Sequence, residues 1–115
     1  MERVCCIVSM ARQNPNRIPY PRQEQLLEML VAVIHRLPSK AAVRNFFKDI
    51  LNRQERLMLV RRLQVAQLLV AGKTYREIET KLRVSPNTIA RIERWVHFGR
   101  GGYRAAIAVL KGKSR

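Results

Sequence analysis

The stretch RVSPNTIARIERWV, residues 83–96, decides the fold of this 115-residue chain. Its Ser85-Pro86 pair is typical of a sharp helix start. A serine hydroxyl accepts hydrogen bonds from the free amides of the first turn, and proline is tolerated at the first helical position. The pair therefore predicts a helix that begins at Pro86.

That helix has two different sides. Residues three and four apart share a face of a helix, so the apolar and polar side chains separate. The apolar side holds Ile89, Ile92 and Val96, and the polar side holds Asn87, Arg91 and Arg94. One side is expected to be buried and the other to contact a partner.

A second short helix precedes it. Thr74 and Glu77 fit a capping box at the start of TYREIETKL, residues 74–82, and a turn near Arg83 follows. Helix, short turn and helix over about 20 residues is the helix-turn-helix arrangement, here predicted over 74–98. The residues expected to pack between the two helices are Ile78, Leu82, Val84, Ile89 and Ile92.

Helix-turn-helix proteins read bases with the N-terminal residues of the second helix, which lies in the major groove. Asparagine pairs with adenine, arginine with guanine or phosphate, and a threonine or alanine methyl group contacts the thymine methyl group. The residues that match these roles are Asn87, Thr88, Ala90, Arg91 and Arg94. The alternative is that NTIARIER is only a solvated surface helix.

The charge of the chain favours a polyanionic partner. Lys and Arg number 23 against 8 Asp and Glu, a net charge of +15. Such a balance points first to nucleic acid and second to an anionic membrane surface. No apolar run approaches the roughly 18–20 residues that span a bilayer, so we expect no membrane partner and a cytoplasmic location.

Hydrophobic periodicity predicts an all-α fold of about six helices, without strands. The expected helices are 22–37, 40–51, a longer one from Asn52 to a stop at Gly72, the two helices of the motif, and 102–110. The long helix is apolar on more than one face, which favours a homodimer. Residues 1–21 are expected to be a flexible arm, 22–111 the helical DNA-binding domain, and 112–115 a basic tail.

Other chemistry is not expected. His35 and His97 have no carboxylate or thiol at ligand spacing, so neither a metal site nor a cofactor is predicted. No nucleophile elbow or phosphate-cradling loop is present, and the chain is not expected to be an enzyme. Cys5 and Cys6 are interpreted as reduced thiols, and translation starting at Met1 or at Met10 remains open.

The order FFKDILNRQERLMLVRRLQVAQLLVAGKTYREIETKLRVSPNTIARIERWVHFG, residues 46–99, resembles the Trp repressor superfamily and, within it, the small YerC-type proteins. The QER, GKTYREI and S.NTIAR segments carry this resemblance, which covers roughly residues 24–104. It implies an interlaced all-helical homodimer with two DNA-reading heads.

The resemblance also implies site residues. Its DNA-contacting positions are Arg76, Pro86, Asn87, Thr88 and Ala90. Arg83, Ser85 and Pro86 replace the family's glycine-rich turn, and we include all three in the predicted DNA-binding set. This replacement argues against carrying over the family's operator sequence and corepressor switch.

A ligand pocket is a further implication. The two arginines that hold the tryptophan corepressor align with Arg62 and Arg91, and Trp95 completes the candidate pocket. Small residues around that ligand align with Ile92 and Trp95, whose bulk should close the cavity. A small-molecule corepressor is left open, but tryptophan is disfavoured.

The sequence thus predicts a sequence-specific transcriptional regulator, a repressor by resemblance, that binds double-stranded DNA as a homodimer. Two alternatives stay open. The first is a nonspecific DNA- or RNA-binding protein driven by its positive charge, and the second is a module whose helix-turn-helix binds a protein.

Overall fold

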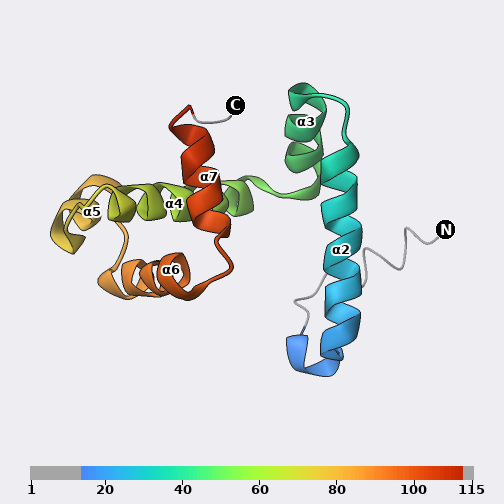
Figure 1. The fold of residues 1–115 in the computed structure, drawn as a ribbon, viewed down its shortest axis with the longest axis horizontal. Helices are drawn as coiled ribbons and strands as arrows, with labels where there is room; N and C mark the ends of the chain where they lie inside the picture. Colours follow the sequence, from blue (N-terminus) through green and yellow to red (C-terminus); the bar gives the residue numbers. More distant parts are fainter. Residues whose placement is uncertain (1–13, 113–115) are drawn as a thin grey trace. The chain divides into compact units, whose positions relative to one another are not determined.

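The computed structural model describes residues 14–112, which contain six α-helices, one short 3-10 helix and no β-strand (Figure 1). The elements are η1 (Pro15–Arg17), α2 (Tyr20–Arg36), α3 (Lys40–Ile50), α4 (Arg53–Val70), α5 (Tyr75–Leu82), α6 (Pro86–Phe98) and α7 (Gly102–Leu110). The predicted all-α class and the six helices are confirmed. Residues 1–13 of the predicted arm, with Cys5, Cys6 and both candidate start positions, and residues 113–115 of the predicted tail lie outside the described residues.

The described chain divides into two units, one ending at Asn45 and the other beginning at Phe46. In the first unit, the Gln23 side-chain amide donates hydrogen bonds to the carbonyl oxygens of Pro15 and Ile18, both at 2.8 Å. These bonds hold η1 against the first turns of α2. Residues 14–21, assigned to the arm above, therefore include η1 and the first two residues of α2.

Helix α2 presents apolar side chains to solvent along its length. None of its residues from Tyr20 to Arg36 is buried, and Leu27 and Met29 are 52% and 63% exposed. The helix begins two residues earlier than predicted because a proline near the first turn, here Pro21, lacks only an N–H that the helix does not need. It ends before Pro38, as predicted.

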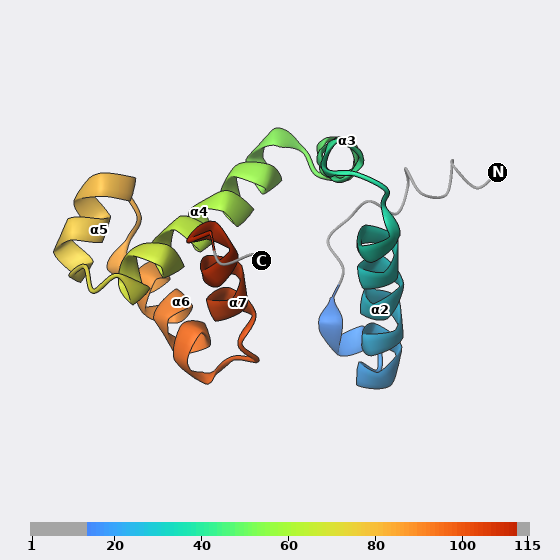
Figure 2. The same ribbon diagram turned by 45° about the horizontal axis from the view of Figure 1, so that its top comes forward.

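Helix α4 is the centre of the second unit. Asn52 and Glu55 form the predicted capping box, in which each backbone N–H donates to the other's side chain at 2.8 Å. Gly72, with a φ of 90°, ends the helix in the left-handed conformation that favours glycine. Helices α5, α6 and α7 all pack on α4 (Figure 2).

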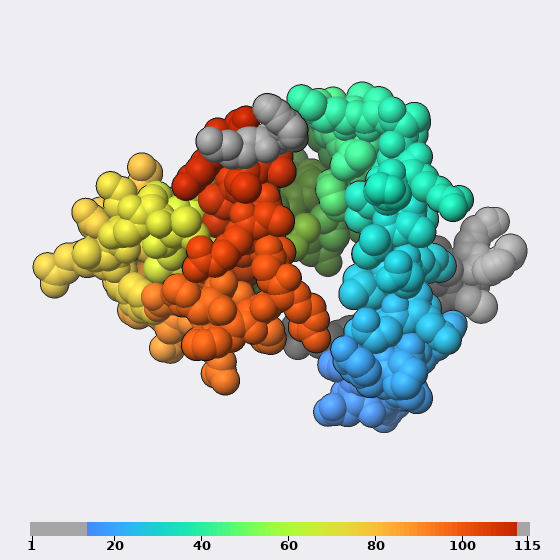
Figure 3. All heavy atoms as spheres, in the orientation of Figure 1, coloured from blue at the N-terminus to red at the C-terminus, as the bar shows by residue number. Residues whose placement is uncertain are grey.

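The core of this unit lies between α4 and the helix-turn-helix. It consists of Val65, Ala66, Ile78, Ile89, Ile92, Val96 and Ile107, with Leu82 and Val84 packed against it. Every residue predicted to lie between the two helices of the motif is in this cluster. In the space-filling view the atoms of α6 and α7, orange to red, lie directly against those of α4 (Figure 3).

The other side of α4 is not covered within the described chain. Leu57, Met58, Leu59 and Val60 are about half exposed, between 47% and 57%. The predicted surplus of apolar faces on this helix is therefore present.

The connection from α6 to α7 depends on Gly99. Its N–H donates to the carbonyl oxygen of Trp95 at 2.9 Å, and a Cβ at this position would overlap that same oxygen. A side chain here would displace backbone atoms, so the close approach requires glycine.

Ile89 anchors α6 to the core, and its loss should destabilise the fold. It is fully buried, so Ile89→Ala is expected to lower the free energy of unfolding by about 2–5 kcal/mol. Thr80→Ala, at an exposed position of α5, should change it by no more than about 0.5 kcal/mol. Urea denaturation at one protein concentration measures both, and equal losses in the two variants would contradict the core assignment.

Candidate nucleic-acid interface

The first helix of the motif starts with the predicted capping box. The Thr74 N–H donates to Glu77 Oε1 at 2.8 Å, and the Glu77 N–H donates to Thr74 Oγ1 at 3.1 Å. The hydrogen bond from the Thr74 backbone, followed by that from its hydroxyl, lowers the pKa of Glu77 below its ordinary value. The charged carboxylate also suits a helix N-terminus, where the macrodipole is positive.

The turn between the helices is made by Arg83. With φ 56° and ψ 46°, it is the one non-glycine residue between 14 and 112 with a positive φ. Its N–H donates to the Glu79 carbonyl oxygen at 2.8 Å, which closes α5. The left-handed conformation allows the chain to reverse direction within three residues, at a steric cost for any side chain.

Arg61 of α4 ties this turn to the core helix. Its guanidinium donates to the carbonyl oxygen of Leu82, the last residue of α5. The patterns used to analyse the sequence do not predict this contact. The chain carries no local pattern that places Arg61 beside a carbonyl 21 residues later.

Helix α6 begins as the Ser-Pro pair predicts. Ser85 is the N-cap, Pro86 is the first helical residue, and the Thr88 N–H donates to Ser85 Oγ at 3.3 Å. The two hydroxyl groups of Ser85 and Thr88 are also within hydrogen-bond distance, at 3.1 Å.

The predicted DNA-binding residues lie on the outside of the motif. We call Asn87, Ala90, Arg91 and Arg94 the reading face of α6. All four are exposed, while Ile89, Ile92 and Val96 on the opposite side are buried. None of the four is acidic. The exposed side of the helix is therefore available to an anionic partner from Asn87 to Arg94.

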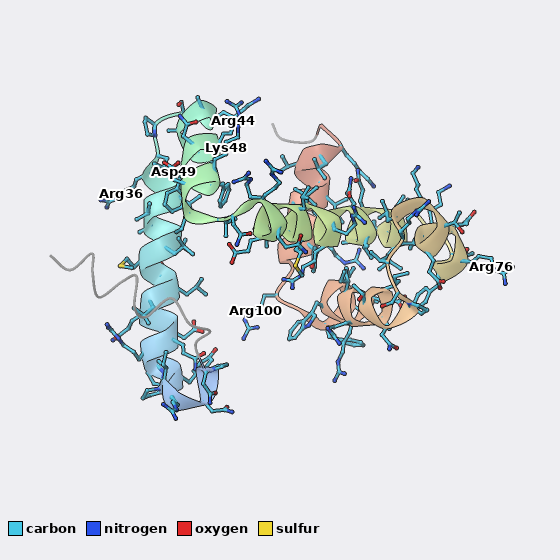
Figure 4. All side chains as sticks on the ribbon, turned by 180° about the vertical axis from the view of Figure 1, so that it is seen from behind. Arg36, Arg44, Lys48, Asp49, Arg76 and Arg100 are labelled. Atoms are coloured by element: carbon cyan, nitrogen blue, oxygen red, sulfur yellow. The ribbon has the colours of Figure 1, made fainter. Side chains whose placement is uncertain are left out.

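The remaining predicted DNA contacts surround this face. Arg83, Ser85 and Pro86 are exposed at the turn, and Thr88 is half-buried. Arg76 is exposed on α5, and its side chain extends away from the neighbouring helices (Figure 4). The same view shows Arg100 extending from the loop between α6 and α7.

A hollow of about 580 Å³ lies between α4 and the start of α6. Four arginines line it, namely Arg61, Arg62, Arg83 and Arg91, together with Ser85, Thr88 and Trp95. The structure thus brings together Arg62, Arg91 and Trp95, the three residues of the candidate pocket.

The expectation that Trp95 closes this pocket is wrong for the isolated chain. Trp95 lines the hollow but is 54% exposed, and the space beside it is open. The reason is its place on α6: Ile92 and Val96 occupy the buried side, so the intervening Trp95 is turned outward.

Comparison with known proteins identifies the family. A model of the family described as Trp repressor protein matches residues 25–111, which is most of the chain. The chain belongs to the Trp repressor family. The family consists of DNA-binding helix-turn-helix regulators rather than enzymes. Within residues 14–112, no helix is long and apolar enough to cross a membrane.

One relative is a bacterial protein that is described only as uncharacterized. Uncharacterized protein YerC of Bacillus subtilis (strain 168) is 38% identical over 66 residues, which are 57% of this chain and 64% of the relative. The match therefore spans less than two thirds of the relative's length. No solved structure matches the chain.

The left-handed turn at Arg83 generates a test of the local backbone. Glycine adopts this conformation without steric cost, whereas a β-branched residue does not. We expect Arg83→Gly to keep or raise the denaturation midpoint, and Arg83→Val to lower the free energy of unfolding by about 1–2 kcal/mol. A valine variant as stable as the glycine variant in urea melts would show that the turn is not left-handed.

Proposed function

We propose that this protein is a sequence-specific transcriptional repressor that reads double-stranded DNA in the cytoplasm with the reading face of α6. The observation that carries the proposal is this face itself: exposed, free of acidic residues and backed by a buried apolar side. The geometry matches that of helix-turn-helix proteins, whose second helix enters the major groove.

The chemistry of the reading face supports base recognition. Asn87 lies in the first turn of α6 and is suited to adenine, while Arg91 and Arg94 are suited to guanine or to phosphates. Arg83 and Arg76 flank the face and supply contacts to the DNA backbone. The net charge of +15 adds sequence-independent attraction to DNA.

The hollow beside α6 fits the same proposal. Its four arginines lie around Ser85. In the first turn of α6 the Asn87 N–H has no carbonyl partner within the helix, whereas Pro86 lacks an N–H and the Thr88 N–H donates to Ser85 Oγ. A DNA phosphate at the start of α6 would therefore be neutralised from several sides. The proposal requires no small-molecule corepressor.

A homodimer belongs to the proposal. The apolar side chains of α2 and the uncovered side of α4 are exposed in the isolated chain, including Leu27, Val31 and Leu57. Exposed apolar faces of this extent are covered in stable proteins, and a second copy supplies an equal apolar surface. Two reading helices about 34 Å apart would then bind a near-palindromic site.

Selection of bound sequences from a random duplex library tests base reading. The wild-type protein should enrich a near-palindromic motif, and Asn87→Ala/Arg91→Ala should lose the motif while keeping weak, salt-sensitive binding.

The matched control is Arg44→Ala/Asn45→Ala, which removes the same two residue types from exposed positions of α3. It should enrich the wild-type motif. Retention of DNA without enrichment by the wild type would favour the alternative, a nonspecific nucleic-acid-binding protein, and no binding at low salt would favour a protein partner.

The dimer predicts that a charge on the apolar face of α2 disrupts assembly. Leu30→Asp should raise the dimer dissociation constant at least tenfold, because a carboxylate would be buried without a partner. Gln25→Asp, on the opposite side of the same helix, should leave it unchanged. Sedimentation equilibrium measures both, and a monomeric wild-type protein would refute the dimer.

A further inference from the structure

A polar contact joins the two helices of the motif on the side away from the reading face. The Tyr75 hydroxyl donates a hydrogen bond to Glu93 Oε1. Tyr75 is the first residue of α5, and Glu93 lies in the second half of α6. Both side chains are half-buried, and the Tyr75 ring also packs against the hydrophobic core.

The contact extends to α7 through two longer approaches. Glu93 Oε2 is 3.8 Å from His97 Nε2, one turn further along α6. His97 Nδ1 is in turn 3.5 Å from Arg104 Nη2 on α7. Glu93 is thus held between groups of α5 and α6 and is not free to reach the reading face.

Glu93 has no part in the proposed base contacts. It is the one carboxylate on α6, in a chain where positive charge attracts the DNA. A carboxylate weakens DNA binding through charge alone. Its presence on the reading helix therefore calls for a role that outweighs this cost.

The position of the contact indicates that role. Helices α5 and α6 are joined only at the turn, and Tyr75 lies about 10 Å from that turn along α5, at 1.5 Å per residue over seven residues. Glu93 lies about as far from the turn along α6. A bond between points remote from a joint restrains the angle of the joint more tightly than a bond near it.

The apolar core alone fixes this angle less well. Ile78 and Ile89 are fully buried between the helices, but burial of apolar surface is non-directional. The hydrogen bond from Tyr75 to a carboxylate has a preferred length and direction. The two interactions together define both the separation and the crossing angle of the helices.

We propose that Tyr75 and Glu93 are positioning residues, whose hydrogen bond sets the crossing angle of α5 and α6 and so the register of the reading face in the major groove. The proposal rests on the proposed function. It assigns to Glu93 a contribution to sequence-specific binding even though its charge opposes DNA binding.

The first measurement does not involve DNA. The Glu93 carboxylate accepts a hydrogen bond from the Tyr75 hydroxyl. This bond, with burial and the negative charge of Glu93, raises the pKa of Tyr75 above its ordinary value. NMR titration of the Tyr75 ring carbon should show this raised pKa in the wild type, and Glu93→Gln should bring it back toward the ordinary value. An ordinary pKa in the wild type would overturn the proposal.

The second measurement compares affinity for the selected duplex and for a random duplex at one salt concentration. Tyr75→Phe removes the donor and should weaken specific binding about tenfold, the size expected for one hydrogen bond to a charged group. Glu93→Gln keeps an oxygen that accepts from Tyr75 but loses the charge, so it should weaken specific binding less. Nonspecific binding should be unchanged in Tyr75→Phe and slightly stronger in Glu93→Gln. The double variant should bind the selected duplex no more weakly than Tyr75→Phe, because the hydroxyl donor is already absent.

Glu79→Gln and Tyr20→Phe are the matched controls. Glu79→Gln removes the same charge from α5 and should strengthen binding to both duplexes, so a loss of specific affinity in Glu93→Gln cannot come from charge. Tyr20→Phe removes an exposed hydroxyl from α2 and should not change the affinity ratio. The proposal would be overturned if Tyr75→Phe and Glu93→Gln bound the selected duplex as tightly as the control variants do.

The two proposals fail in different ways. A wild-type protein that enriches no duplex refutes the reading function, and with it the role of the contact, even if Tyr75 titrates with a raised pKa. Enrichment by the wild type together with unaltered enrichment in Tyr75→Phe refutes only the positioning role.

Discussion

The burial of three isoleucines between α4 and the helix-turn-helix is the constraint on which the rest of the structure depends. Ile78 from α5 and Ile89 and Ile92 from α6 meet the fully buried Val65 and Ala66 of α4. Because these side chains define the inner side of α6, they also define its outer side. The exposure of Asn87, Arg91 and Arg94 follows from the burial of Ile89, Ile92 and Val96, because the two sets lie on opposite sides of the helix.

The local chemistry of the turns supports this packing. Helix α5 is delimited by the capping box at Thr74 and by the left-handed Arg83. Helix α6 starts at the N-cap Ser85. The Arg61 guanidinium then joins the end of α5 to α4. A short motif with little apolar surface is thus held by directional bonds at its ends and by the core in its middle.

Most of this arrangement could be predicted from the sequence, because it depends on local patterns. Ser85-Pro86, the two capping boxes and the spacing of Ile89, Ile92 and Val96 are each read from fewer than ten neighbouring residues, and each is found in the structure. The prediction was less accurate where the determining partner is distant in the sequence. The contacts of Arg61 with Leu82 and of Tyr75 with Glu93 join residues 21 and 18 positions apart.

The candidate pocket shows the same limit of prediction from the sequence. The alignment of Arg62 and Arg91 predicted that they lie together, and they line one hollow with Trp95. Side-chain bulk predicted that Trp95 fills it, yet helix periodicity turns Trp95 outward. The volume of a residue alone does not determine whether it fills a cavity; its direction from the helix does.

The family assignment and the packing of α6 lead to one central claim, that the exposed side of α6 binds DNA. Backbone amide chemical-shift mapping during titration with a selected duplex tests it most directly. The account predicts that the largest changes fall on residues 83–94, with smaller changes near Arg76. Largest changes confined to α2 or α7, with residues 83–94 unaffected, would contradict it.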